Sequence, residues 1–139
     1  MKTHRAVACA IATGLLCSLA SSVRAEPPGP VVFSEIMWMG SSASSSDEWI
    51  ELFNCSAAPI DLSGWVITRL GSDGEPTEML RLDPVSMAPS DVFLISNYSD
   101  GNARTVLGVT PDLVSSAVSL SNSKLQVWLF DAPPKREVD

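Results

Sequence analysis

From Val31 onward the chain consists of short apolar runs separated by Gly, Pro, Ser and Asp residues, and this pattern limits the folds that it can adopt. No long window keeps the spacing of an amphipathic helix. The best helical window, 111–120, begins at Pro111 and would give only a short turn. About six to eight short strands joined by such turns predict an all-β fold, an antiparallel β-sandwich.

The clearest apolar runs are predicted to be strands, at 31–38, 48–54, 65–70, 77–82, 92–96 and 124–130. The Ser-rich segment between the first two is predicted to be a flexible loop with nothing to pack against. Two prolines make 83–90 a turn. Residues 97–120 are expected to be mostly loop, with weak strand signals at 105–109 and 118–120.

The N-terminal segment, 1–25, has the pattern of a secretory signal peptide. It begins with two basic residues, continues as an uncharged apolar stretch at 6–20, and ends at Ala25, a small residue of the kind found at the cleavage position. After cleavage the chain begins with a Pro-rich linker, 26–30, which can join neither a helix nor a central strand.

One mature domain, 31–139, is therefore expected outside the cell or at its surface. Two alternatives stay open for the N-terminal segment, namely lipid attachment at Cys17 and an uncleaved membrane anchor. Leu16 precedes Cys17 at a position where a lipoprotein signal has a small residue. No later apolar run approaches the roughly 20 residues that span a bilayer, so the sequence predicts no transmembrane span in the mature domain.

The composition excludes several classes of function. The chain has a net charge of −7, and three of its nine basic residues lie in the predicted signal peptide, so the mature domain is acidic and unsuited to nucleic acid. The only histidine, His4, and two of the three cysteines lie in the same segment. Histidine-containing triads and zinc sites are therefore excluded. The eight glycines form no phosphate-binding motif, and we expect no cofactor.

Carboxylate side chains are the remaining candidates for chemistry. Glu35, Glu48 and Glu51 lie closest to the apolar strands, and a glycosidase needs two such groups across a cleft. A sandwich of this length leaves little chain to build that cleft, so we expect no catalytic residues and no enzyme.

Two acidic loop clusters contain oxygen ligands of the kind that calcium takes: Asp73, Glu75 and Glu78, or Asn97, Asp100 and Asn102. Neither matches an EF-hand loop, and we expect solvated loops and no metal site.

Side-chain alternation suggests a candidate binding face. In the second strand, Ile50 and Leu52 share one face, and the last strand presents Leu125, Val127 and Leu129 in the same way. If these aliphatic faces fill the core, aromatic rings beside polar groups lie outside it, as a protein or polysaccharide ligand requires. The residues of this candidate face are Trp49, Glu51, Phe53, Gln126, Trp128 and Phe130. The alternatives are that loop 97–120 covers them, or that one face is an aromatic core.

Two features near the second strand stay open. Cys55 would be the only thiol of the mature domain, and we expect a partly buried small side chain, with an intermolecular disulfide as the alternative. The triplets that begin at Asn54 and Asn97 match the N-glycosylation sequon, and the sequence does not indicate whether they are used.

Three segments resemble the lamin tail domain family in its exported bacterial form: SEIMWMG at 34–40, DEWIELFN at 47–54 and IDLSGW at 60–65. Segments 87–95 and 119–131 resemble it more loosely. The resemblance implies an immunoglobulin-like sandwich without known catalytic residues, whose bacterial members commonly stand beside secreted or surface enzymes. We interpret the motif residues as structural, with Asp61 and Gly64 forming a turn and Trp65 an aromatic plug between the sheets. The set comprises Glu48, Trp49, Ile50, Leu52, Asp61, Leu62, Gly64 and Trp65.

The expected function is that of an exported, non-enzymatic binding, adhesion or tethering module. The alternative is an accessory or N-terminal domain of a larger secreted hydrolase. No coiled coil precedes the domain, which argues against an intermediate-filament subunit. The family pattern normally continues into a closing strand beyond 137–139, and two prolines follow the last predicted strand. We therefore expect an open sheet edge at 124–130 that self-associates or accepts a donor strand.

Overall fold

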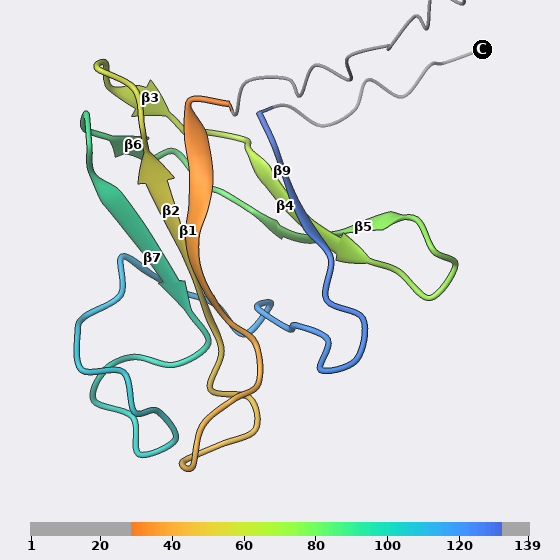
Figure 1. Ribbon diagram of the computed structural model, residues 1–139. Coiled ribbons are helices and arrows are strands. Elements are labelled where there is room, and N and C mark those ends of the chain that lie inside the picture. Colours follow the sequence, from red (N-terminus) through yellow and green to blue (C-terminus); the bar gives the residue numbers. More distant parts are fainter. Residues whose placement is uncertain (1–28, 132–139) are drawn as a thin grey trace, which may run out of the picture.

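The computed structural model describes residues 29–131, which form two packed layers of β-strands (Figure 1). One sheet has the strand order β1-β2-β7-β8 and the other β5-β4-β9, while β3 and β6 form a separate short pair. The bounds are β1 Val31–Met37, β2 Trp49–Asn54, β3 Ile60–Asp61, β4 Val66–Leu70, β5 Pro76–Arg81, β6 Ser86–Met87, β7 Val92–Ser96, β8 Leu113–Val114 and β9 Val127–Phe130. The predicted immunoglobulin-like β-sandwich is confirmed.

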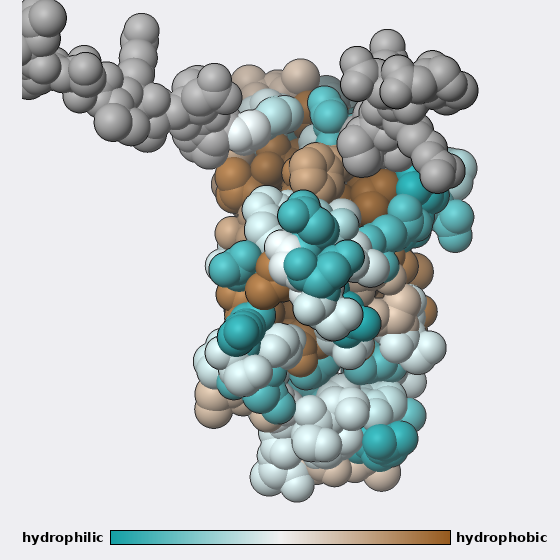
Figure 2. All heavy atoms as spheres, turned by 90° about the vertical axis from the view of Figure 1, so that its right-hand side faces the viewer, coloured by the Kyte–Doolittle hydropathy of each residue, from teal (hydrophilic) through white to brown (hydrophobic). Residues whose placement is uncertain are grey.

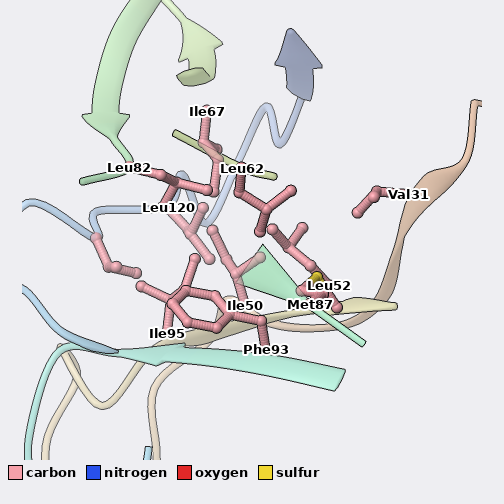
Figure 3. Close-up of a cluster of buried hydrophobic side chains, with 11 residues drawn as sticks. Val31, Ile50, Leu52, Leu62, Ile67, Leu82, Met87, Phe93, Ile95 and Leu120 are labelled. Carbon is pink, nitrogen blue, oxygen red and sulfur yellow. The ribbon is translucent and has the colours of Figure 1, made fainter. Parts of the chain in front are cut away.

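The core between the two sheets is aliphatic at its centre (Figure 3). Ile50 and Leu52 point inward from β2 and meet Ile67 of β4, and all three are fully buried. Phe93 and Ile95 of β7 pack beside them (Figure 3). The inward face predicted for the second strand is therefore confirmed. The other buried members of the cluster are Val31, Leu62, Leu82, Met87, Val118 and Leu120.

Trp65 lies at the margin of this core, which corrects the expectation of an aromatic plug between the sheets. Its side chain packs against the buried cluster but stays partly exposed. It lines a cavity of about 280 Å³ together with Val31 and Leu129. Branched aliphatic side chains already fill the space between the layers, so the large ring is left to close one end.

Three two-residue strands, β3, β6 and β8, were not predicted, because two residues are too few to show alternation. β8 runs parallel to β7, with Leu113 opposite Ile95, so the sandwich is not purely antiparallel. No strand forms at 105–109 or 118–120, and no helical turn forms at 111–120. Residues 106, 118 and 120 are instead held by hydrogen bonds to side chains next to the ends of β2 and β7, which an apolar pattern does not reveal.

The last strand begins later than predicted, at Val127 instead of residue 124. The Oγ of Ser121 accepts hydrogen bonds from the backbone N–H groups of Ser123 and Lys124 and turns the chain there. Regular pairing with β4 then runs from Val127 to Phe130.

A β-bulge in β1 determines which side chains lie on the outer surface of the first sheet. The register with β2 shifts between Phe33 and Glu35, which leaves Ser34 as the extra residue. After the bulge, Glu35 lies directly opposite Glu51 of β2. The bulge thus brings two carboxylates side by side on the outward face.

Candidate binding site

The outward face of the first sheet carries the first half of the predicted binding face. Cross-strand pairing places Phe53 between Val32 and Val92 at one end of this face, and Met37 opposite Trp49 at the other. The Glu35–Glu51 pair lies between these apolar groups. We call this face the Trp49 surface and define it by Val32, Glu35, Met37, Trp49, Glu51, Phe53 and Val92. The aromatic rings on it are partly exposed.

Neutral donors orient the two carboxylates of the Trp49 surface. The indole Nε1 of Trp49 donates to Oε1 of Glu35 at 2.7 Å, and the Oγ of Ser34 donates to Oε1 of Glu51 at 2.7 Å. Like charges directly opposite one another on a sheet repel. The one salt bridge among residues 29–131 joins Arg81 to Glu78 on the other sheet, so it leaves this repulsion uncompensated.

The second half of the predicted face, Gln126, Trp128 and Phe130, lies on the other sheet. In β9, Leu129 packs on the core, whereas the partly buried Trp128 and Phe130 pair with Thr68 and Val66, which are buried on the other side of β4. The inner faces of the two sheets meet at the core. The six residues therefore form two surfaces on opposite sides of the sandwich, and Trp49, Glu51 and Phe53 are brought together without the other three.

Two consecutive carboxylates, Asp47 and Glu48, hold the loops at one end of the sandwich. Oδ2 of Asp47 accepts the backbone N–H of Val106 at 2.8 Å, and Oε2 of Glu48 accepts that of Leu120 at 3.0 Å. Both carboxylates are buried, and Glu48 is 5% exposed. The pair thereby ties the β7–β8 loop and the β8–β9 loop to the start of β2.

Two further side chains complete the attachment of the β8–β9 loop. Nδ2 of Asn97 donates to the carbonyl oxygen of Val118 at 2.7 Å, and Nη1 of Arg69 donates to that of Ser119 at 2.8 Å. With Glu48, these side chains satisfy three consecutive loop residues. Sequence reasoning missed Asp47, Arg69 and Asn97 in this role, because the partners are distant in the sequence.

The pKa values of the two buried carboxylates move in opposite directions. Burial raises the pKa of Glu48, and the Leu120 N–H and the Arg69 charge offset only part of that effect. Burial also acts to raise the pKa of Asp47, but nearby hydrogen-bond donors, among them the Val106 N–H, outweigh it and lower the pKa. Within one dipeptide, Asp47 thus favours the charged form more strongly than Glu48 does.

Asn54, at the end of β2, is a structural side chain. It is fully buried, and its Nδ2 donates to the carbonyl oxygens of Ala58 and Ala88 at 2.9 Å each. Its Oδ1 accepts the backbone N–H of Ser56 at 2.9 Å. Because Nδ2 is the atom to which a glycan would attach, the folded domain does not present this sequon for glycosylation.

The turn before β4 has the predicted chemistry. Oδ1 of Asp61 accepts hydrogen bonds from the backbone N–H and the hydroxyl of Ser63, and these bonds lower the pKa of Asp61. Gly64 has a φ of +79°, which side-chain-bearing residues rarely adopt. Leu62 is fully buried beneath the turn. The motif residues of this segment are therefore structural.

Cys55 is exposed and free, which corrects the expectation of a partly buried side chain. It follows the last residue of β2, where the chain leaves the sheet, and its Sγ lies 3.2 Å from the carbonyl oxygen of Pro30. The Cys55 thiol is therefore on the surface and is not part of the core packing.

The loop oxygens considered for calcium have other partners. Asp73 accepts the N–H of Glu75, Asp100 accepts the hydroxyl of Thr110, and Asn102 accepts the N–H of Arg104. Across residues 29–131, no three His, Cys, Asp or Glu side chains converge as a metal site would require. That same stretch of chain also has no helix of the length and hydrophobicity needed to cross a membrane.

Comparisons with known proteins agree with the fold. A model of the lamin tail domain matches residues 24–139. No curated protein was found to match the chain. Lamin tail domains are immunoglobulin-like and often serve as protein-interaction modules. On the evidence of this match and of the sandwich described above, the chain belongs to the lamin tail domain family.

Proposed function

We propose that the protein is an exported, non-enzymatic module that tethers a protein partner at the cell surface or outside the cell through the Trp49 surface. Export is supported by the signal-peptide pattern of residues 1–25. Binding is supported by membership of a family that often mediates protein interactions. The observation that carries the proposal is the Glu35–Glu51 pair beside partly exposed aromatic rings.

The chemistry of this surface selects a basic partner. Glu35 and Glu51 repel one another in the free protein, and a Lys or Arg side chain placed between them relieves that repulsion. The Trp49 ring offers its face to the same cation. Apolar groups at both ends of the surface, Met37 and Phe53 among them, add contact area for hydrophobic neighbours of the basic residue. The partner segment is therefore basic at its centre and apolar on both sides.

A titration with a defined peptide tests this proposal. We expect a capped peptide with one lysine flanked by valines to shift the amide NMR signals of β1 and β2, and the same peptide with norleucine in place of lysine to shift them much less. Combining Glu35→Gln with Glu51→Gln is expected to weaken binding about tenfold, or about 1.4 kcal/mol, because the hydrogen-bonding shape remains and the charge is lost.

The matched control changes two exposed carboxylates in and after the turn between β4 and β5, Asp73→Asn and Glu75→Asn. Like the test pair, it removes two negative charges, so equal weakening of peptide binding by both pairs would indicate non-specific attraction and contradict the proposal. Export is tested separately by sequencing the N-terminus of the protein recovered outside the cell. A mature start at Glu26 supports export, and retention of residues 1–25 inside the cell refutes it.

The sheet edges support a second mode of association. Within residues 29–131, β9 pairs only with β4 and β1 pairs only with β2. The cavity lined by Trp65 lies between Val31, the first residue of β1, and Leu129 of β9. We propose that a second copy or a donor strand adds to the edge of β9, because an edge strand presents unpaired backbone groups.

A further inference from the structure

A polar groove of about 520 Å³ lies at the end of the sandwich where three loops meet. These loops follow β1, β7 and β8, and the first two lie at the lower end of the molecule in Figure 1. Figure 2 shows mainly pale and teal residues at this end on the face it presents. Hydroxyl and amide side chains dominate the lining: Ser45, Ser46, Asn97, Ser116, Ser119 and Asn122.

The groove offers hydrogen bonds instead of apolar contact. Its two aliphatic residues, Val118 and Leu120, are 0% and 7% exposed and so present little surface. Ser116 and Asn122 are exposed, and neither side chain hydrogen-bonds to another residue of the stretch 29–131. Each serine hydroxyl and each amide can both donate and accept. The groove therefore suits a ligand that carries many hydroxyl groups.

The walls are held in place before any ligand binds. Glu48 and Asn97 hold the 118–120 segment by the hydrogen bonds described above. The guanidinium of Arg104 lies 4.8 Å from the centre of the Tyr98 ring. A preformed site loses little conformational freedom on binding, so modest contacts suffice for measurable affinity.

The Ser-rich loop between β1 and β2 is also well defined, which corrects the prediction of a flexible loop with nothing to pack against. The backbone N–H groups of Ser41 and Asp47 both donate to the carbonyl oxygen of Ser44. Gly40 has a φ of +68°, and a Cβ there would lie 2.6 Å from the Ser45 backbone. The loop is thus closely folded at the edge of the groove.

We propose that this groove binds a small neutral saccharide. Its volume lies within the roughly 300–1,000 Å³ of small-ligand sites. Loops rich in Ser, Asn and Tyr at one end of an immunoglobulin-like sandwich supply adaptable hydrogen bonds in other binding proteins. Of its two charged residues, Glu48 is buried and Arg104 lies over the Tyr98 ring, so uncharged polar groups form most of the lining. A peptide ligand would draw on a sheet edge or apolar pockets, and this groove has neither within its lining.

The saccharide groove is separate from the Trp49 surface. Glu48, just before β2, lines the groove, while its neighbour Trp49, the first residue of β2, points to the outward face and contacts Glu35. Variants at the two places therefore test the two proposals independently. Failure of the lysine peptide to bind leaves the groove unaffected, and failure of saccharides to bind leaves the Trp49 surface unaffected.

A titration of the full-length protein with cellobiose, maltose and N,N′-diacetylchitobiose tests the proposal. We expect at least one of the three to give saturable shifts of the amide NMR signals at 45–48, 97–104 and 116–122, with a dissociation constant in the millimolar range or lower. Absence of saturable shifts with all three sugars overturns the proposal. Equal shifts spread over both sheets, without a preference for the groove, overturn it as well.

Variants identify the groups that bind the sugar. Combining Ser116→Ala with Asn122→Ala is expected to weaken binding about tenfold, because both free side chains line the groove. The matched control combines Ser42→Ala with Ser99→Ala, two exposed serines of neighbouring loops outside the lining. Equal affinity of groove variant and parent overturns the proposal, as does tighter binding of a lysine peptide at the same residues.

Discussion

At the residue scale, the Glu48 carboxylate stabilises the fold as a hydrogen-bond acceptor, whereas its negative charge is unfavourable in a buried position. Burial disfavours the ionised form, yet Oε2 supplies the acceptor that the Leu120 N–H needs. Replacement by alanine removes that acceptor and leaves a buried donor unpaired. We expect Glu48→Ala to cost about 1–3 kcal/mol of unfolding free energy, measured by urea denaturation.

The pH dependence of stability isolates the charge of Glu48. Its raised pKa means that the folded state binds the proton more tightly than the unfolded state, whose pKa is near the usual 4.5. Its contribution is therefore greatest below about pH 4.5 and is lost as the pH rises through the folded pKa. Glu48→Gln keeps an acceptor for Leu120 and removes this loss. The stability of the glutamine variant should rise relative to the parent between pH 4 and 7, and a falling difference would contradict this.

The alternation of side chains along a strand can be predicted from the sequence, whereas contacts between distant residues cannot. A period of two is a local property, so the inward Ile50 and Leu52 and the outward Trp49 follow from their spacing. The bond from Leu120 to Glu48 joins residues 72 positions apart, and no local pattern records it. The Glu35–Glu51 pair depends on a one-residue bulge, which shifts the register without an apolar signal.

At the scale of elements, the aliphatic centre and the aromatic margin of the core should respond differently to truncation. Leu52→Ala leaves an enclosed cavity and is expected to cost about 3–4 kcal/mol. Trp65→Ala widens a cavity that is already open to solvent, so we expect a smaller cost of about 2 kcal/mol despite the larger side chain. Urea denaturation of both variants measures the difference, and a larger loss for Trp65→Ala would place its ring in the core centre.

The long strands were predicted from the sequence, whereas the short strands and the loops that depend on distant partners were missed. All six long apolar runs became strands within a few residues of their expected bounds, because each contributes apolar side chains to the core or packs them against it. Of the short strands, β3 and β6 pair with each other and β8 pairs with the longer strand β7, so each depends on a partner that is distant in the sequence. The loop after β8 takes its shape from Asn97 and Arg69, side chains of other segments. The local sequence therefore predicts the positions of the sheet strands better than the conformation of the loops that form the groove.

At the scale of the whole molecule, the ends of the described chain and the groove lie at opposite ends of the sandwich. Gly29 and Asp131 line the same cavity, at the upper end in Figure 1, and the groove lies at the lower end. A chain attached through either terminus therefore presents the groove away from its attachment. This arrangement suits the tethering role proposed above.

Among residues 29–131, β9 pairs with β4 alone, and this leads to a prediction about association. We expect sedimentation velocity of the protein to show a concentration-dependent dimer or larger species, because unpaired strand groups favour pairing with a second copy. Hydrogen exchange should show incomplete protection from Val127 to Phe130 in dilute samples. A protein that stays monomeric at high micromolar concentration with full protection of these amides would contradict the prediction.

The closed position of Asn54 sets a time limit on its modification in any cell that glycosylates secreted chains. Oligosaccharide transfer needs an accessible amide nitrogen, and one partner of that nitrogen, the distant carbonyl oxygen of Ala88, arrives only when β2 has reached its place beside β7. A chain modified earlier cannot bury the side chain and form the native end of β2. The fraction of molecules that carry sugar at Asn54 would therefore equal the fraction of chains that met the transferase before this end of the sheet folded.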